Sequence, residues 1–229
     1  MFGVFQVTIR VDRIDQHSIE EEIISHNTLI HRIVRPAVRG IAPNGVTPNQ
    51  LTTLRLVTGI AAAAGFAIGG TVWPHVGGVI FILSMLLDRA DGELARQTGQ
   101  SSLSGYRYDL ICDCSANVIA FVGIGIGLAS GTLGHSAVIL GILAGFGIAV
   151  LFWQLNVAKL HAVPGYALWG GRVVVDPDDA MVFVPILIWC GWAQPMLIAA
   201  AAITPAAALW LWISAVRSGG KPGDDAARS

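Results

Sequence analysis

Residues 88–113 read DRADGELARQTGQSSLSGYRYDLICD, and this stretch places Asp88, Asp91, Asp109 and Asp113 between strongly apolar segments. Carboxylates beside a membrane core are costly, and those found there commonly serve a function. On helices, spacings of three and four residues put each pair of aspartates on one helix face. If the two helices run antiparallel through a short connection, all four carboxylates meet at one end. We therefore expect bound cations, because unscreened carboxylates at that distance repel strongly.

The smaller residues of this stretch indicate phosphate chemistry at the same place. All-oxygen ligands suit Mg²⁺ or Mn²⁺, and two such ions can clamp a phosphoryl group. Gly92 and Gly105 lack side chains, so a nucleotide or phosphate can approach their backbone. Ala95 keeps the same surface open, and Arg96 offers several donors to phosphate oxygens. One of the four carboxylates can also accept the proton of an attacking hydroxyl.

The composition is typical of an integral membrane protein. Hydrophobic residues make up 54% of the 229 residues and charged residues 13%, against about 25% charged residues in a soluble domain. The net charge of −1 argues against a nucleic-acid partner, which would favour a basic patch.

An all-α domain of six membrane spans is expected over residues 46–217, because a span needs about 20 mostly apolar residues. All 14 Lys and Arg residues lie near the expected cytoplasmic ends of these spans or outside them, which places both termini and the aspartates in the cytoplasm. A mobile tail is expected over 218–229. The spans are predicted at 50–70, 72–95, 106–130, 135–158, 179–195 and 196–217.

The first 45 residues are predicted to form a cytoplasmic segment. Apolar residues alternate at Val7, Ile9 and Val11, a weak strand signal. Residues 17–40 read as an amphipathic helix with a basic face, which Pro36 should kink or end early. Such a helix either lies in the headgroup layer or packs on the cytoplasmic face of the protein.

Small residues recur at four-residue spacing, at Gly123 and Gly127 and again at Gly141 and Gly145. This spacing lets helices approach closely. It predicts tight packing within the chain or, alternatively, a dimer interface.

The pattern D-x2-D-G-x2-A-R-x8-G-x3-D-x3-D is met at all eight fixed positions. It resembles the signature of the CDP-alcohol phosphotransferase family, membrane enzymes that make phospholipids. The resemblance implies a six-helix bundle, usually dimeric, with a polar cavity open to the cytoplasm and to lipid. It implies transfer of a phosphatidyl group from a CDP-linked lipid donor, such as CDP-diacylglycerol, to an acceptor hydroxyl, with release of CMP.

The same resemblance assigns roles to residues. Asp88, Asp91 and Asp109 would bind metal, and Asp113 would join a second metal or act as the catalytic base. A looser likeness covers Thr47-Pro-Asn49-x2-Thr52, which resembles a segment beside the cytidine in many members. The residues expected to line the CDP site are Asn49, Thr52, Gly92, Ala95, Arg96, Gly105 and Asp109.

The acceptor is less clearly indicated. An anionic acceptor, inositol phosphate or glycerol phosphate, is favoured because Arg55 and Arg107 flank the motif. Lys159 and Arg172 are further candidate cations, in a loop at 159–178 that could cover the acceptor. The bacterial inner membrane is the expected location. The alternatives are a divalent-cation transporter, which would use the same aspartates, and a catalytically silent scaffold.

Overall fold

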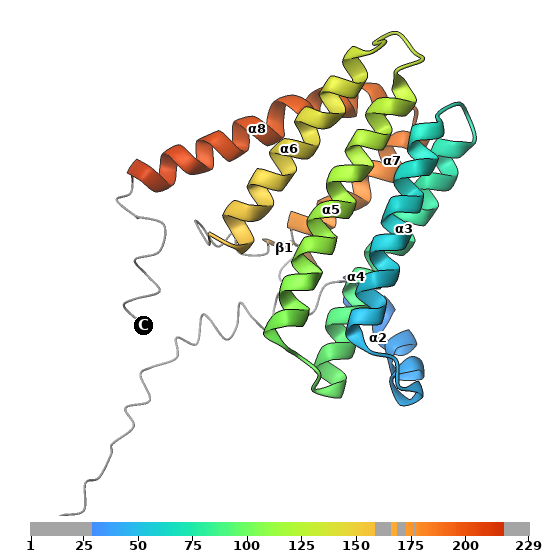
Figure 1. Ribbon diagram of the computed structural model, residues 1–229, viewed down its shortest axis with the longest axis vertical. Helices are drawn as coiled ribbons and strands as arrows, with labels where there is room; N and C mark the ends of the chain where they lie inside the picture. The colour runs from blue at the N-terminus through green and yellow to red at the C-terminus, as the bar shows by residue number, and fades with distance from the viewer. Residues whose placement is uncertain (1–28, 159–165, 169–172, 176, 218–229) are drawn as a thin grey trace, which may run out of the picture.

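The computed structural model describes residues 29–158, 166–168, 173–175 and 177–217, and its packed body is α-helical, as predicted (Figure 1). Helices α3 to α6 lie side by side, whereas α8 leans away from this bundle across α6. The helices are α2 (Leu29–Ile41), the 3-10 turn η1 (Ala42–Asn44), α3 (Pro48–Ile68), α4 (Trp73–Thr98), α5 (Leu103–Leu128), α6 (Ser136–Asn156), the 3-10 helix η2 (Pro177–Val182), α7 (Phe183–Trp189) and α8 (Ala193–Arg217).

Four of these helices are long and apolar enough to cross a membrane, namely α3, α5, α6 and α8. Helix α4 matches the second expected span in position but carries half of the charged motif. The fifth expected span, 179–195, differs most, since η2 and α7 together cover only Pro177–Trp189. Their combined rise is about 22 Å, less than a hydrocarbon core. A left-handed turn at Gly191 (φ 76°) then starts α8 earlier than expected.

Glycines hold α3, α5 and α6 in close contact. A Cβ atom at Gly123 would overlap the backbone oxygen of Ala63, and one at Gly127 would overlap that of Phe66. Between α5 and α6, a Cβ at Gly141 would lie 2.6 Å from the backbone oxygen of Phe121. The small-residue spacing therefore serves packing within the chain, the first of the two alternatives.

Helix α2 packs across the end of the bundle from which the α4–α5 connection leaves (Figure 1). Val34 and Val38 are buried against Leu51 and Leu94. Of the two outcomes predicted for Pro36, a kink or an early end, the early end does not occur, because α2 continues to Ile41. Burial of a valine on each side of the proline offsets the backbone hydrogen bond that proline removes. The expected strand at 7–11 and the helical residues 17–28 lie outside the described residues.

A short hairpin, absent from the all-α prediction, lies between α6 and η2. Strands β1 (Tyr166–Leu168) and β2 (Val173–Val175) pair antiparallel, with Tyr166 opposite Val175. The run of β-branched valines favours an extended backbone. The hairpin falls within the loop expected at 159–178; Lys159, Arg172 and the tail 218–229 lie outside the described residues.

We predict that Gly123→Ala lowers the free energy of unfolding by about 1–3 kcal/mol, because the added methyl group must push α3 and α5 apart. Thermal unfolding of the purified protein in detergent would measure the loss. Gly40→Ala is the matched control, since nothing lies within 4 Å of a Cβ at that helical position. Equal losses in the two variants would contradict the close contact.

Candidate active site

A short connection reverses the chain between α4 and α5, which both pack against α3, and brings the two halves of the motif together. Gly99 ends α4 in the left-handed conformation (φ 66°), where glycine meets no steric cost. Ser102 then caps α5, accepting a 3.0 Å hydrogen bond from the backbone N–H of Gly105. Oxygen atoms of Asp88, Asp109 and Asp113 consequently lie within 4.8 Å of one another. The predicted convergence of the carboxylates is present for these three.

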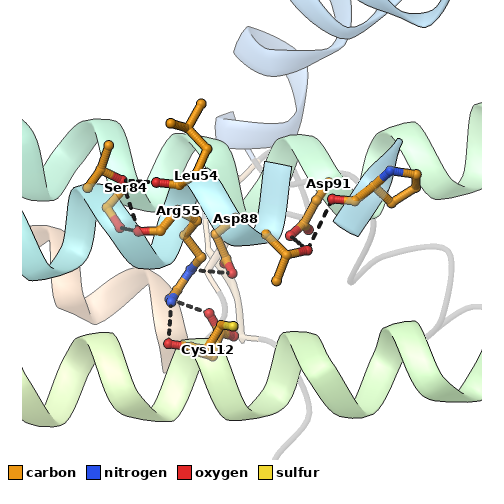
Figure 2. A network of polar contacts seen from close by, with 10 residues as sticks. Leu54, Arg55, Ser84, Asp88, Asp91 and Cys112 are labelled. Atoms are coloured by element: carbon orange, nitrogen blue, oxygen red, sulfur yellow. Dashed lines mark hydrogen bonds and ion pairs between the residues drawn. The ribbon is translucent and has the colours of Figure 1, made fainter. Parts of the chain in front are cut away.

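The fourth aspartate, Asp91, faces α3. Its Oδ2 accepts a 2.6 Å hydrogen bond from the hydroxyl of Thr52, and both residues are buried. This contact ties the motif to the start of α3, the segment that sequence analysis linked to the nucleotide only loosely. Figure 2 shows Asp91 further along the helices than Asp88, with its carboxylate in the hydrogen bond to α3.

Arg55 of α3 supplies the positive charge nearest the cluster (Figure 2). Its Nε lies 2.9 Å from Oδ1 of Asp88, and its terminal nitrogens contact Oδ1 of Asp113 and the backbone oxygen of Cys112, the latter at 3.0 Å. Only 3% of Arg55 is exposed. Its backbone oxygen also accepts a hydrogen bond from Ser84 of α4. One residue of α3 thus connects α4 with α5.

The site opens into a cavity of about 360 Å³ at the end of the helices. Among its lining residues are all seven that were predicted to surround CDP, Asn49, Thr52, Gly92, Ala95, Arg96, Gly105 and Asp109, together with Asp91. Asp88 and Asp113 are not among the lining residues, and they lie behind the wall with Arg55. The cavity size is within the range of small-molecule and cofactor sites.

The glycines and Arg96 shape the cavity wall. A Cβ added at Gly92 would lie 3.5 Å from a terminal nitrogen of Arg96, so the guanidinium extends beside that bare backbone. A Cβ at Gly105 would come within 3.3 Å of the side-chain oxygen of Asn49. A side chain at either position would project into the space around these polar groups, which agrees with the role expected for both glycines.

The donor set fits a divalent cation. Oδ1 of Asp109 is buried and has no hydrogen-bond partner among the described residues. A buried carboxylate oxygen without a partner is costly, and a hard cation would satisfy it. The neighbouring donors are likewise carboxylate oxygens, the ligands that Mg²⁺ and Mn²⁺ prefer.

Two of the cations suggested for an anionic acceptor are placed differently from expectation. Arg55 was considered for this role, but its guanidinium is engaged by Asp88, Asp113 and Cys112 and does not line the cavity. Arg107 is exposed and also lies outside the cavity wall. The sequence showed their charge but not the direction of their side chains.

Sequence analysis missed several residues of the site. Glu93 of α4 is buried and contacts Arg96; its position three residues before Arg96 was the available signal. Three of the eight residues between the motif halves also line the cavity, and because the pattern leaves their identity open it gave no indication of this contact. The additional lining residues are Pro48, Gln100, Ser101, Ser102 and Tyr106.

An α-helical body with spans of membrane length, an acidic cluster that fits metal and a nucleotide-sized cavity together define a membrane enzyme of phosphate transfer. Residues 45–216 match the CDP-alcohol phosphatidyltransferase family. The chain belongs to this family and is accordingly a transferase of phosphatidyl groups.

The fold has a counterpart among solved structures. The crystal structure of Mycobacterium tuberculosis phosphatidylinositol phosphate synthase with CDP-DAG bound is similar, with a TM-score of 0.58 and 20% sequence identity. The match covers 81% of this chain and 91% of that chain. At this identity the likeness concerns the fold. Comparison with curated proteins gave no significant match.

We predict that, in the presence of a metal chelator, Arg55→Met lowers the melting temperature of the protein by roughly 10 °C. Removing one partner of buried ion pairs lowers the free energy of unfolding by about 3–5 kcal/mol. Added Mg²⁺ should raise the melting temperature of the variant more than that of the unchanged protein, since the ion replaces the lost charge. Thermal unfolding in detergent measures both effects. Arg107→Met, at an exposed position, is the control; equal melting temperatures for the two variants would contradict the role of Arg55.

Proposed function

We propose that this protein transfers the phosphatidyl group of a CDP-linked lipid, such as CDP-diacylglycerol, to the hydroxyl of a small acceptor, and releases CMP. The observation that carries the proposal is that one cavity is lined by every residue predicted to surround CDP, including Asp109 of the acidic cluster. The solved structure of similar fold, which has CDP-DAG bound, supports the choice of donor.

In the proposed mechanism two Mg²⁺ or Mn²⁺ ions would be bound by the four aspartates, Asp88, Asp91, Asp109 and Asp113. When bound, these ions neutralise and polarise phosphate oxygens. Arg96 donates hydrogen bonds to the diphosphate, and the bare backbone at Gly92 and Gly105 lets the nucleotide approach. Asn49 and Thr52 lie on the side proposed for cytidine.

Asp113 is proposed as the general base. It takes the proton of the acceptor hydroxyl, whose oxygen forms a bond to the phosphorus distal to cytidine, and the bond from that phosphorus to CMP breaks. Positioning of the hydroxyl and neutralisation of charge supply most of the catalysis in this kind of transfer. Because Arg55 contacts Oδ1 of Asp113, we assign it the orientation of this carboxylate.

We keep an anionic acceptor, inositol phosphate or glycerol phosphate, as the proposed class. Because Arg55 does not line the cavity, the support comes from two resemblances: Asp91-Gly-Glu-Leu-Ala-Arg96 looks more like members that use inositol phosphate, and Leu51-Thr-Thr-Leu-Arg55-Leu looks like the first span of phosphatidylglycerophosphate synthases. The similar fold of a phosphatidylinositol phosphate synthase points in the same direction. Lys159 and Arg172 stay candidate cations for the acceptor phosphate.

We further propose six membrane crossings, with both termini and the cavity in the cytoplasm of a bacterium. α3, α5, α6 and α8 meet the length and apolarity of spans. α4, which packs against α3, and the apolar segment Ala180–Trp189 with its flanking residues would supply the other two crossings. An even number of crossings agrees with Lys and Arg at both ends of the chain. A homodimer is proposed from the family resemblance.

A divalent-cation transporter is the competing proposal. Its site would be expected near the bilayer midplane, on interrupted helices. Here α4 (Trp73–Thr98) and α5 (Leu103–Leu128) are continuous helices, and the carboxylates lie beside a cavity far larger than an ion requires. The arrangement favours the enzyme.

We predict that the purified protein, given CDP-diacylglycerol and Mg²⁺, releases CMP only when the correct acceptor is present. Mass spectrometry of CMP across glycerol phosphate, inositol phosphate, inositol, serine and choline would name the acceptor. A chelator should abolish release, and added Mg²⁺ or Mn²⁺ should restore it. Metal flux into liposomes without any CDP binding would instead support the transporter.

We predict that Asp113→Asn reduces turnover by about 10²- to 10⁴-fold, the usual contribution of a general base. CDP affinity should change little, because Asp113 does not line the cavity. Initial rates of CMP release and calorimetric titration with CDP separate the two effects. Turnover near that of the unchanged protein would remove Asp113 from the role of base.

A further inference from the structure

We propose that α2 contributes to binding of the donor, because Arg35 positions Arg96 through Glu93. Arg35 is then a positioning residue for the donor diphosphate, and the juxtamembrane helix has a role in substrate affinity. This inference rests on the proposed CDP site, in which Arg96 contacts the diphosphate.

Glu93 is the centre of a network between α2 and α4. Its Oε1 lies 3.3 Å from Nε of Arg35 and accepts a 2.9 Å hydrogen bond from the amide of Gln97. Its Oε2 accepts a 3.0 Å hydrogen bond from Arg96. Glu93 is only 6% exposed, so this carboxylate is held in place by three donors on two oxygens.

The contact with Glu93 fixes the orientation of the Arg96 guanidinium. One terminal nitrogen of Arg96 is bound to Glu93, and the guanidinium also lies beside Gly92 at the cavity wall. A guanidinium carries five N–H donors in a rigid plane. Holding one edge of this plane therefore orients the remaining donors without using them up.

Charge balance explains why Arg35 matters. With Arg35 in place, Glu93 divides its single negative charge between two guanidinium groups, and Arg96 keeps a net attraction for phosphate. Without Arg35, Glu93 would pair with Arg96 alone and compete more strongly with the diphosphate. Arg35 thus increases the attraction of Arg96 for the diphosphate without contacting Arg96.

The packing of α2 holds Arg35 at this position. Val34, the preceding residue, is buried in the same cluster as Leu94, the residue after Glu93. Arg39 lies one turn further along α2, is exposed, and shows no ion pair within the described part of the chain. The two arginines of this helix therefore differ in the contact with Glu93, and Arg39 serves as the comparison residue for experiment.

The test is calorimetric titration of full-length protein in nanodiscs with CDP and Mg²⁺, together with steady-state kinetics. Arg35→Met should weaken CDP affinity by roughly 2- to 10-fold, the scale of a partly exposed ion pair. The KM for the CDP-linked donor should rise by the same factor, with kcat and the KM for the acceptor unchanged. Arg39→Met should leave all three unchanged, and Arg35→Lys should recover part of the affinity.

A second cycle tests the route through Glu93. In the Glu93→Gln background, Arg35→Met should have little further effect, because the carboxylate that links the two arginines is gone. An undiminished effect in that background, equal losses for Arg35→Met and Arg39→Met, or no loss for Arg35→Met would each overturn this inference alone. Absence of CDP binding by the unchanged protein would overturn the proposed function and this inference with it.

Discussion

The mutual repulsion of partly buried carboxylates is the constraint on which the rest of this structure depends. Asp88, Asp109 and Asp113 approach within 4.8 Å of one another among apolar helices, which is unfavourable unless positive charge lies among them. Arg55 supplies that charge from a third helix. Helix α3 must therefore lie against both α4 and α5, and the glycine contacts with Ala63 and Phe66 are what allow it to come so close.

One face of α3 contributes to the site from the cavity to the inner aspartates. Asn49, Thr52 and Arg55 recur every three residues along α3, so they lie on one side of the helix. Asn49 lines the cavity, Thr52 binds Asp91, and Arg55 binds the two inner aspartates. The family motif lies wholly on α4 and α5, but a third wall from α3 gives those residues their orientation. The fold and the site are in this sense a single arrangement.

The sequence predicted the parts of the site that follow from spacing. Helical periodicity placed each pair of aspartates on one face, and Gly99 with Ser102 provides the short turn that the antiparallel pair requires. How side chains and helices are oriented toward neighbouring elements was not predictable from the sequence. Nothing in the sequence shows that Arg55 points inward, that Val34 and Val38 carry α2 past Pro36, or that the segment before α8 ends at Trp189. These outcomes depend on tertiary contacts, which local propensity does not report.

The incomplete pairing of the carboxylates also accounts for the proposed use of metal. Arg55 pairs with Asp88 and Asp113, whereas Oδ1 of Asp109 has no hydrogen-bond partner in the described part of the chain. Enough charge is paired for the helices to pack, yet enough is left to attract a divalent cation. Full pairing by protein cations would stabilise the bundle and remove the attraction for metal, whereas no pairing would oppose folding. The position of Arg55 behind the cavity wall, away from the nucleotide side, meets both requirements.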